Sequence, residues 1–113
     1  MKLKPIKDKK KIEKIFNEGE FVRGISISAK WYNFEDDDFG FGISVPKRLI
    51  PSAVRRNKIK RRIKSVLIKS DLVRNVRMGV CIFLLYESSK ELSFSEIQPK
   101  VVELLKKLTK SFD

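Results

Sequence analysis

The segment that most restricts the fold is a continuously apolar run at residues 79–86, GVCIFLLY. A run of this length without alternation is typical of a strand buried on both faces, although the run alone does not exclude a helix. An alternating segment, FGFGISV at 39–45, precedes it, and a long helical pattern lies between the two. A strand–helix–strand order is typical of two parallel strands joined by a crossover helix.

A second alternating segment lies at residues 25–34, ISISAKWYNF. One of its faces is mainly apolar and comprises Ile25, Ile27, Ala29 and Trp31, and the other comprises Ser26, Ser28, Lys30 and Tyr32. An acidic turn at residues 35–38 separates it from the strand at 39–45, so we expect these two strands to form an antiparallel hairpin. Parallel and antiparallel pairs together predict an α+β fold, a two-layer α/β sandwich with a mixed sheet.

Two more helices are predicted, one at each end of the chain. Residues 7–18 place Ile12, Ile15 and Phe16 on one stripe, with Asp8 as the N-cap and Gly19 as the stop. The last helix has a stripe of Val101, Leu104, Leu105, Leu108 and Phe112. Its start is open between a capping box of Ser95 with Gln98 and a start with Pro99 at the first helical position. No repeat or low-complexity linker is visible, so residues 1–113 are predicted to form a single domain.

The positive charge of the chain is concentrated in one block. The formal net charge is +12, and residues 47–77 carry twelve basic side chains against one acid, Asp71. The flanking segments 1–46 and 78–113 are almost neutral. An excess needed only for solubility would be spread along the chain, so the block predicts a polyanionic partner, either a nucleic acid or an anionic membrane.

The segment 53–67, AVRRNKIKRRIKSVL, carries most of this charge. It lies in a predicted helix that has Ser52 as its N-cap and runs to about Ser70. Its apolar stripe is narrow and aliphatic, and comprises Ile59, Ile63, Val66 and Leu67. A membrane-surface helix needs a wider apolar face with bulky side chains, so RNA or DNA is favoured over a bilayer. Asn57, among the cations, offers a donor and an acceptor to a base edge or a 2′-hydroxyl.

Residue types exclude several kinds of catalytic centre. The chain has no His and one Cys, so neither a conventional zinc site nor a Ser-His-Asp or Cys-His centre can be built. Cys81 is expected to be a small buried hydrophobe, and the lack of a possible internal disulfide suits the cytoplasm. The carboxylates of Glu35, Asp36, Asp37 and Asp38 could be weighed as a magnesium site, but a solvated acidic loop is expected. No apolar run is long enough to span a membrane, and no secretory signal is expected.

The segment FGISVPKR followed by AVRRNKIKRRIK resembles the protein subunit of bacterial ribonuclease P. The family signature is Gly-x-Ser-Val-x-Lys at a strand end, then Ala-Val-x-Arg-Asn-x-x-Lys-Arg-x-x-Arg on a helix. The matching residues are Gly42, Ser44, Val45, Lys47, Ala53, Val54, Arg56, Asn57, Lys60 and Arg61. Lys64 stands where arginine is usual, which keeps the charge but loses the bidentate fork, and Ser65 stands where an acid or amide is usual.

The resemblance implies a fold and a function that the patterns alone do not give. It implies a four-stranded mixed sheet with a left-handed βαβ crossover, like domain 2 of ribosomal protein S5. It also implies that the RNA subunit is the catalyst, that it uses Mg²⁺, and that it removes the 5′ leader of precursor tRNA. The resemblance further implies that the protein binds both RNAs, with neither DNA nor a membrane as a partner. It implies a cytoplasmic protein that is a monomer by itself and has no catalytic group, metal or cofactor of its own.

The resemblance also implies two sets of contact residues. The RNA-subunit set comprises Lys47, Arg48, Arg55, Arg56, Asn57, Lys58, Lys60, Arg61, Arg62 and Lys64. The leader set, in a cleft between the sheet and the N-terminal helix, comprises Phe16, Ser28, Lys30 and Tyr32. Aromatic rings beside positive charge are the usual platform for single strands. For Phe16, plain core packing is the competing interpretation.

Three other functions compete with this one. A structural RNA-binding protein with an S5-like domain would share the sheet and the basic helix, but would need no leader site. A DNA-binding module would need a helix-turn-helix partner or a dimer zipper, which the sequence does not show. A protein that is itself a nuclease would need catalytic groups that this composition lacks. The pair Arg56–Asn57 with Lys60–Arg61 favours the ribonuclease P subunit.

Overall fold

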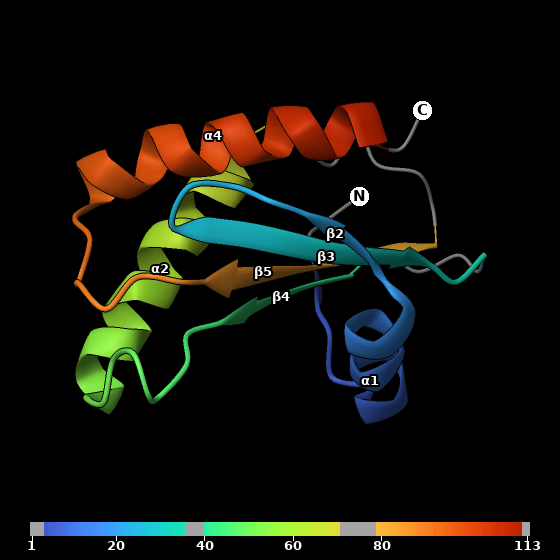
Figure 1. Ribbon diagram of the computed structural model, residues 1–113, viewed down its shortest axis with the longest axis horizontal. Coiled ribbons are helices and arrows are strands. Elements are labelled where there is room, and N and C mark those ends of the chain that lie inside the picture. The colour runs from blue at the N-terminus through green and yellow to red at the C-terminus, as the bar shows by residue number, and fades with distance from the viewer. Residues whose placement is uncertain (1–3, 36–39, 71–78, 112–113) are drawn as a thin grey trace.

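The computed structural model describes residues 4–35, 40–70 and 79–111. Figure 1 shows the elements in their chain order. They are β1 (Lys4–Pro5), α1 (Lys9–Glu18), β2 (Glu20–Val22), β3 (Ile27–Asn33), β4 (Gly40–Ser44), α2 (Ala53–Lys69), β5 (Val80–Tyr86) and α4 (Phe94–Ser111).

The strands form one mixed sheet in the order β1-β4-β5-β3-β2. The central strand β5 pairs parallel with β4 and antiparallel with β3, so that Phe83 lies between Gly42 on one side and Lys30 on the other. The predicted α+β class with a mixed sheet is confirmed. The two-residue β1, parallel to β4, adds a fifth strand to the four that were expected.

The expected antiparallel hairpin between residues 25–34 and 39–45 is wrong. β5 lies between these two strands. It is the most apolar strand, and at the centre of the sheet it has a neighbouring strand on each edge and helices packed on each face. The antiparallel neighbour that precedes β3 in the chain is β2. β3 also starts later than expected: Ile25 is 76% exposed, and Ser26 has a φ of 65°. Of the acidic turn, Asp36–Asp38 lie outside the described residues.

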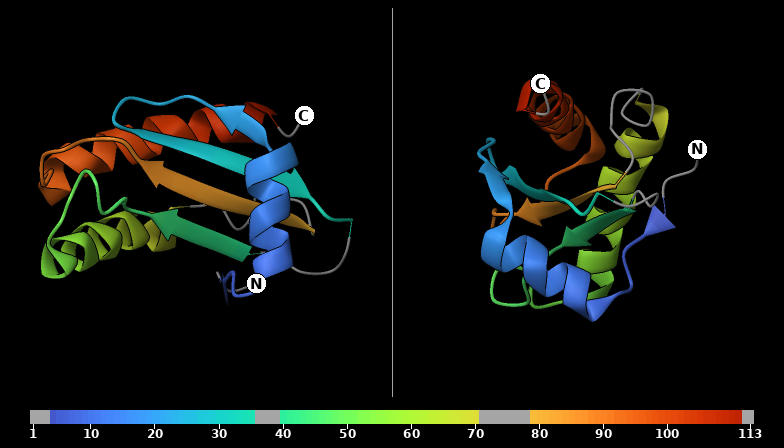
Figure 2. Two further views of the ribbon diagram at one scale, coloured as in Figure 1. Left: turned by 60° about the horizontal axis from the view of Figure 1, so that its bottom comes forward. Right: turned by 90° about the vertical axis from the view of Figure 1, so that its right-hand side faces the viewer.

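The helices divide between the two faces of the sheet. α2 and α4 cover one face, and α1 crosses part of the opposite face (Figure 2). The fold therefore has the two expected layers and, in α1, a partial third layer. Alternation along β5 sends Ile82 and Leu84 into the main core with Ile63 and Leu104, and turns Phe83 toward α1. With α2 behind the sheet as seen from α1, the β4–α2–β5 crossover is left-handed.

The predicted ends of the first two helices are confirmed. The Asp8 carboxylate accepts the Lys10 backbone N–H at 2.9 Å, and the Ser52 hydroxyl accepts that of Arg55 at 3.3 Å. α1 ends at Glu18 with Gly19 as its C-cap, so Gly19 stops the helix as expected, but with a φ of −69°. Close packing requires a glycine at position 19. A Cβ there would overlap the carbonyl oxygen of Ile15 and lie 2.9 Å from the carbonyl oxygen of Trp31.

Both expected starts of the last helix are wrong, because α4 begins at Phe94. Ser93 and Glu96 form the capping box instead: the Glu96 N–H donates to the Ser93 hydroxyl at 3.3 Å, and the Ser93 N–H donates to the Glu96 carboxylate at 3.2 Å. The earlier start places Ile97 in the helix, where it is completely buried. The free energy gained by this burial offsets the loss of one helical hydrogen bond, because Pro99 in the second turn has no N–H to donate.

This capping box predicts an acid-dependent loss of stability. The backbone N–H and hydroxyl of Ser93 hold the pKa of Glu96 below its usual value. A carboxylate with a lowered pKa in the folded chain stabilises the fold above its unfolded pKa and loses that contribution as the pH falls through the folded pKa. We therefore expect the free energy of unfolding to fall less steeply below about pH 4.5 in Glu96→Gln than in the wild type. Denaturant titrations from pH 7 to pH 3 measure this, and parallel curves for the two proteins would contradict it.

Candidate nucleic-acid interface

The basic helix rests on the sheet through the narrow stripe that its sequence predicts. Ile59, Ile63, Val66 and Leu67 are all buried, and no other residue of α2 is. The cations of α2 therefore occupy the rest of its circumference. They fall into two groups, because some of them are engaged by other parts of the protein.

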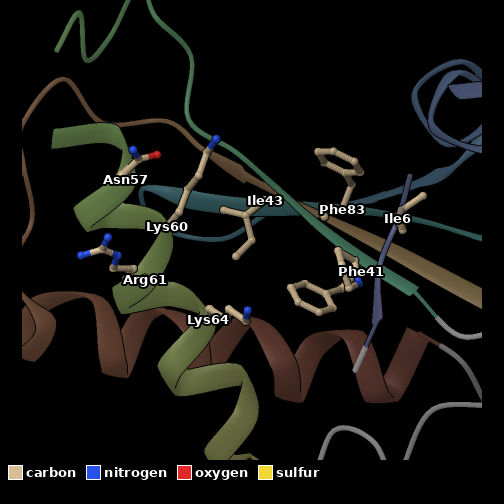
Figure 3. A pocket seen from close by; sticks show the side chains of 10 residues that line it. Ile6, Phe41, Ile43, Asn57, Lys60, Arg61, Lys64 and Phe83 are labelled. Carbon is tan, nitrogen blue, oxygen red and sulfur yellow. The ribbon is translucent and has the colours of Figure 1, made fainter. Parts of the chain in front are cut away.

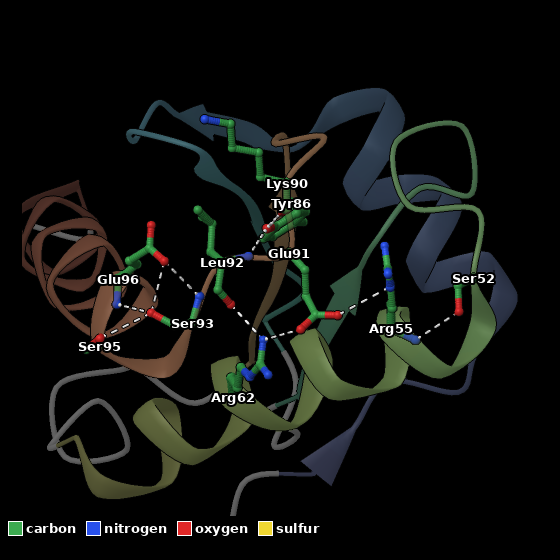
Figure 4. Close-up of polar contacts among 10 residues, drawn as sticks. All are labelled: Ser52, Arg55, Arg62, Tyr86, Lys90, Glu91, Leu92, Ser93, Ser95 and Glu96. Carbon is green, nitrogen blue, oxygen red and sulfur yellow. Dashed lines mark hydrogen bonds and ion pairs between the residues drawn. The ribbon is translucent and has the colours of Figure 1, made fainter.

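Glu91 engages the flank of α2 that faces the loop before α4 (Figure 4). Its carboxylate lies 3.7 Å from Arg55 Nε and 3.3 Å from Arg62 Nη1, and Arg62 also donates to the Leu92 carbonyl at 2.8 Å. The loop is held by the buried Tyr86, whose hydroxyl accepts the Leu92 N–H at 3.1 Å and donates to the Lys90 carbonyl. Arg55 and Arg62 are thus partly neutralised before any ligand binds.

Arg56 is also bound to the protein itself. Its Nη1 donates to the carbonyls of Ile50 and Pro51 at 3.0 and 2.8 Å, which ties the loop between β4 and α2 to the helix. Lys47 and Arg48 lie in that loop and are exposed. Arg56 therefore shapes the surface on which these two cations are presented.

The opposite flank of α2 is open. Asn57, Lys60, Arg61 and Lys64 are exposed and line a pocket of about 490 Å³, and Lys58 is exposed near the start of the helix. Figure 3 shows the pocket, whose other walls are Pro5, Ile6, Phe41, Gly42, Ile43 and Phe83. The structure brings together here four of the ten residues that were expected to contact the RNA subunit.

Two of the four expected leader residues meet on the face of the sheet beside α1. Phe16 is 36% exposed, and its ring centroid lies 5.0 Å from that of Phe83. Lys30 donates to the Phe16 carbonyl at 2.7 Å. Phe16 thus both packs on the sheet and presents part of its ring, which combines the two interpretations that its sequence position left open.

The other two expected leader residues do not join this group. Ser28 is completely buried, and its hydroxyl donates to Glu87 at 2.5 Å and accepts the Gly24 N–H at 3.2 Å. Its expected place on an open outward face is therefore wrong. Tyr32 lies in a second pocket on the other flank of α1, with its ring 4.8 Å from that of Phe34.

Lysines surround this second pocket, which has a volume of about 510 Å³. Lys14 Nζ lies 5.5 Å from the Tyr32 ring centroid and also pairs with Glu18. That hydrogen-bonded pair with Glu18 raises the pKa of Lys14. Lys14 therefore stays protonated, and the pocket stays cationic on that side, throughout the physiological pH range.

Three residues of the interface were missed in the sequence. Phe83 was hidden in an apolar run in which both faces look like core, and its role emerges only from the register with Lys30. Glu91 is far from α2 in the chain, so no local pattern connects the two. Ile43 belongs to the apolar positions of an alternating segment, which are typical of a buried face, but it is only partly buried and lines the pocket beside β4.

The arginines that bind Glu91 and those that do not are expected to behave differently. Arg62→Ala removes the hydrogen bond to the Leu92 carbonyl and leaves Glu91 with a weaker partner, so we expect it to lower the free energy of unfolding by about 1–2 kcal/mol. Arg61→Ala, one residue earlier and exposed, should change stability by less than about 0.5 kcal/mol. Urea unfolding of the two variants makes the comparison, and equal stabilities would show that the Glu91 contact does not support the fold.

Neither a metal cluster nor a membrane span is found in the part of the chain that the structure describes. No group of three or more His, Cys, Asp or Glu side chains comes together among residues 4–35, 40–70 and 79–111. Within the same ranges, no helix has the length and apolar character needed to cross a bilayer. Cys81 is buried, as expected.

The fold and this surface define a class of protein, a small α+β protein with one strongly cationic helix at its surface. The sequence profile of the family described as Ribonuclease P matches residues 1–109. The chain is 31% identical over 108 residues to the "Ribonuclease P protein component" of Streptococcus agalactiae serotype III (strain NEM316), covering 89% of this chain and 90% of the relative.

Solved structures agree with this match. The RNase P protein of Staphylococcus aureus is 29% identical, has a TM-score of 0.77, and covers 99% of this chain and 100% of its own. The RNase P protein of Thermotoga maritima, at 20% identity and a TM-score of 0.74, shares the fold over 91% of this chain and 96% of its own. This chain belongs to the ribonuclease P protein family and is a protein component of that ribonucleoprotein.

Proposed function

We propose that this subunit binds the ribonuclease P RNA through the open flank of α2 and the 5′ leader of precursor tRNA on the sheet face beside α1. The observation that carries the proposal is the division of the cations. Glu91 engages one flank of α2, whereas Asn57, Lys60, Arg61 and Lys64 remain exposed on the other. A polyanion gains most where cations have no counter-ion of their own.

The leader is proposed to lie against Phe16 and Phe83, with Lys30 beside them. Exposed aromatic rings near positive charge hold single strands by stacking and by phosphate attraction. Lys30 Nζ donates to the Phe16 carbonyl, and this hydrogen bond fixes the charge at the end of α1. In this arrangement one subunit would contact both RNAs and would hold them together.

We propose that cleavage itself belongs to the RNA and to the Mg²⁺ ions that it holds. The chain has no His, and its described residues gather no set of three or more ligating side chains. The contribution of the protein is then electrostatic, because a cationic surface between two polyanions lowers the concentration of free Mg²⁺ that their association needs. Precursor tRNA is processed in the bacterial cytoplasm, which we propose as the location of the complex, with the free protein as a monomer.

The test is cleavage of a 5′-extended precursor tRNA by ribonuclease P RNA at low Mg²⁺, with and without this protein. We expect the mature 5′ end to form when RNA and protein are both present, and no cleavage by the protein alone. Tight RNA binding without stimulation would instead support a structural RNA-binding protein. A precursor with a one-nucleotide leader is the matched control, because it cannot reach Phe16 and should lose the part of the stimulation that depends on the leader.

A further inference from the structure

We propose that the pocket between α2 and the outer edge of β4 holds one unstacked nucleotide of the RNA that α2 binds. The inference rests on the proposed function and adds the way in which the RNA is held. The occupant is defined by three properties of the pocket: an open strand edge, an apolar floor and a row of lysines.

The strand edge is open because β1 ends early. β1 pairs only with Gly40 and Phe41, and its last hydrogen bond runs from the Ile6 N–H to the Phe41 carbonyl at 2.9 Å. In a strand, residues two apart turn their N–H and C=O groups to the same side. Ile43 therefore directs both groups outward past the end of β1, where no residue that the structure describes pairs with them through the backbone.

The floor and the wall of the pocket have different chemistry. Phe41 is 5% exposed and forms the floor with the half-buried Ile6 and Ile43. In Figure 3 the side chains of Lys60 and Lys64 extend from α2 toward β4, whereas Arg61 extends away from it. A volume of about 490 Å³ lies within the range typical of sites for small ligands.

An RNA duplex fits only half of this surface. A duplex presents phosphates and sugars, which would satisfy the lysines and leave the apolar floor facing water or polar groups. A nucleobase has apolar faces and a polar edge, so an unstacked base matches the floor with its face and the Ile43 backbone and Asn57 amide with its edge. Lys60 and Lys64, one helical turn apart, would then bind the phosphates on either side of it.

The polar groups at the edge do not select one base. The Ile43 backbone and the Asn57 side chain each offer both a donor and an acceptor. Any base edge finds a partner among them, so the pocket would select an unpaired nucleotide by its shape and its exposure. The class of ligand is therefore an unpaired nucleotide within a folded RNA, without a strong base preference.

The experiment is photocrosslinking of the wild-type protein in complex with ribonuclease P RNA that carries 4-thiouridine and 6-thioguanosine at random positions. Peptide mapping should place a crosslink on the β4 segment that contains Ile43, and the crosslinked nucleotide should be unpaired in chemical probing of the free RNA. Crosslinks confined to α2 and to the loop before it, with none on β4, would overturn the inference. Because the protein is unmodified, folding of a variant does not affect this test.

Salt titrations of two variants give an independent measurement. Ile43→Ala should weaken binding to the RNA about tenfold with an unchanged slope of log K against log salt, because it removes an apolar contact and no charge. Ile68→Ala, an exposed isoleucine at the far end of α2, should bind like the wild type. Equal affinity of Ile43→Ala and the wild type would count against the pocket, whereas failure of the wild type to bind the RNA at all would refute the proposed function instead.

Discussion

Replacing Lys60, Arg61 and Lys64 together with Ala is expected to reduce binding to the ribonuclease P RNA several hundred-fold at about 0.1 M salt. Each cation that neutralises a phosphate contributes about 0.9 to the slope of log K against log salt on a duplex. The slope should therefore become shallower by about three, and filter binding between about 50 and 300 mM salt measures it. The three side chains are exposed, so the fold should be retained.

A matched control removes the same charge from a different helix. Lys100, Lys106 and Lys110 lie on α4, and none of them lines the pocket on the open flank of α2. Their joint replacement with Ala lowers the net charge by the same amount, and we expect it to leave the slope nearly unchanged. Equal losses in the two triple variants would show that the RNA responds to overall charge and that α2 is not the binding surface.

Gly42→Val is expected to lower the free energy of unfolding by about 2–3 kcal/mol and also to disturb the proposed leader surface. A Cβ at Gly42 would lie 2.7 Å from Cδ2 of Phe83, so the ring must move. Phe83 is the ring on which Phe16 rests, and its displacement would break the contact that presents Phe16. Thermal unfolding gives the first effect, and cleavage of precursors with long and one-nucleotide leaders gives the second.

A double variant separates the overlap from other effects of the valine. In Gly42→Val with Phe83→Leu the smaller side chain makes room, so the two changes together should cost less stability than the sum of the single changes. Ser44→Val, two residues along on the same face of β4, is the control for a branched side chain whose partner in the register is Leu85 and not Phe83. Additive effects in the double variant would refute the role of Phe83.

Sequence patterns predicted local structure better than strand pairing. The stripe of Ile59, Ile63, Val66 and Leu67, with the Ser52 cap, predicted both the existence of α2 and its buried side, because both depend on residues within a few turns. The place of β5 between β3 and β4 depends on which strand buries the most apolar surface at the centre of the sheet, and this is a comparison between distant segments. Local patterns show only that β3 and β4 follow each other in the chain, which is typical of a hairpin. The left-handed crossover follows from the family resemblance and not from any pattern, since pattern rules favour the opposite hand.

The interface shows the same division. The block of cations was visible in the sequence, but its sorting into engaged and open flanks was not, because Glu91 reaches Arg62 from 29 residues away. Ser28 looked exposed from alternation alone, but it is buried and its hydroxyl donates to Glu87, which is 59 residues away in the chain. Side-chain types predict which ligand is attracted, whereas long-range contacts decide which of the side chains remain to bind it.

The central position of β5 has a consequence for the order in which the ribosome makes the chain. Residues 80–86 are the last strand to be synthesised, and both β3 and β4 need them as a neighbour. Until they emerge from the exit tunnel, the apolar side of α2 has no complete sheet to cover, although α2 precedes β5 in the chain and leaves the tunnel first. Stable folding must therefore wait until residue 86 has left the exit tunnel. A nascent chain stalled after α2 has emerged but before β5 has would expose a cationic, half-apolar segment to the ribosomal RNA around it.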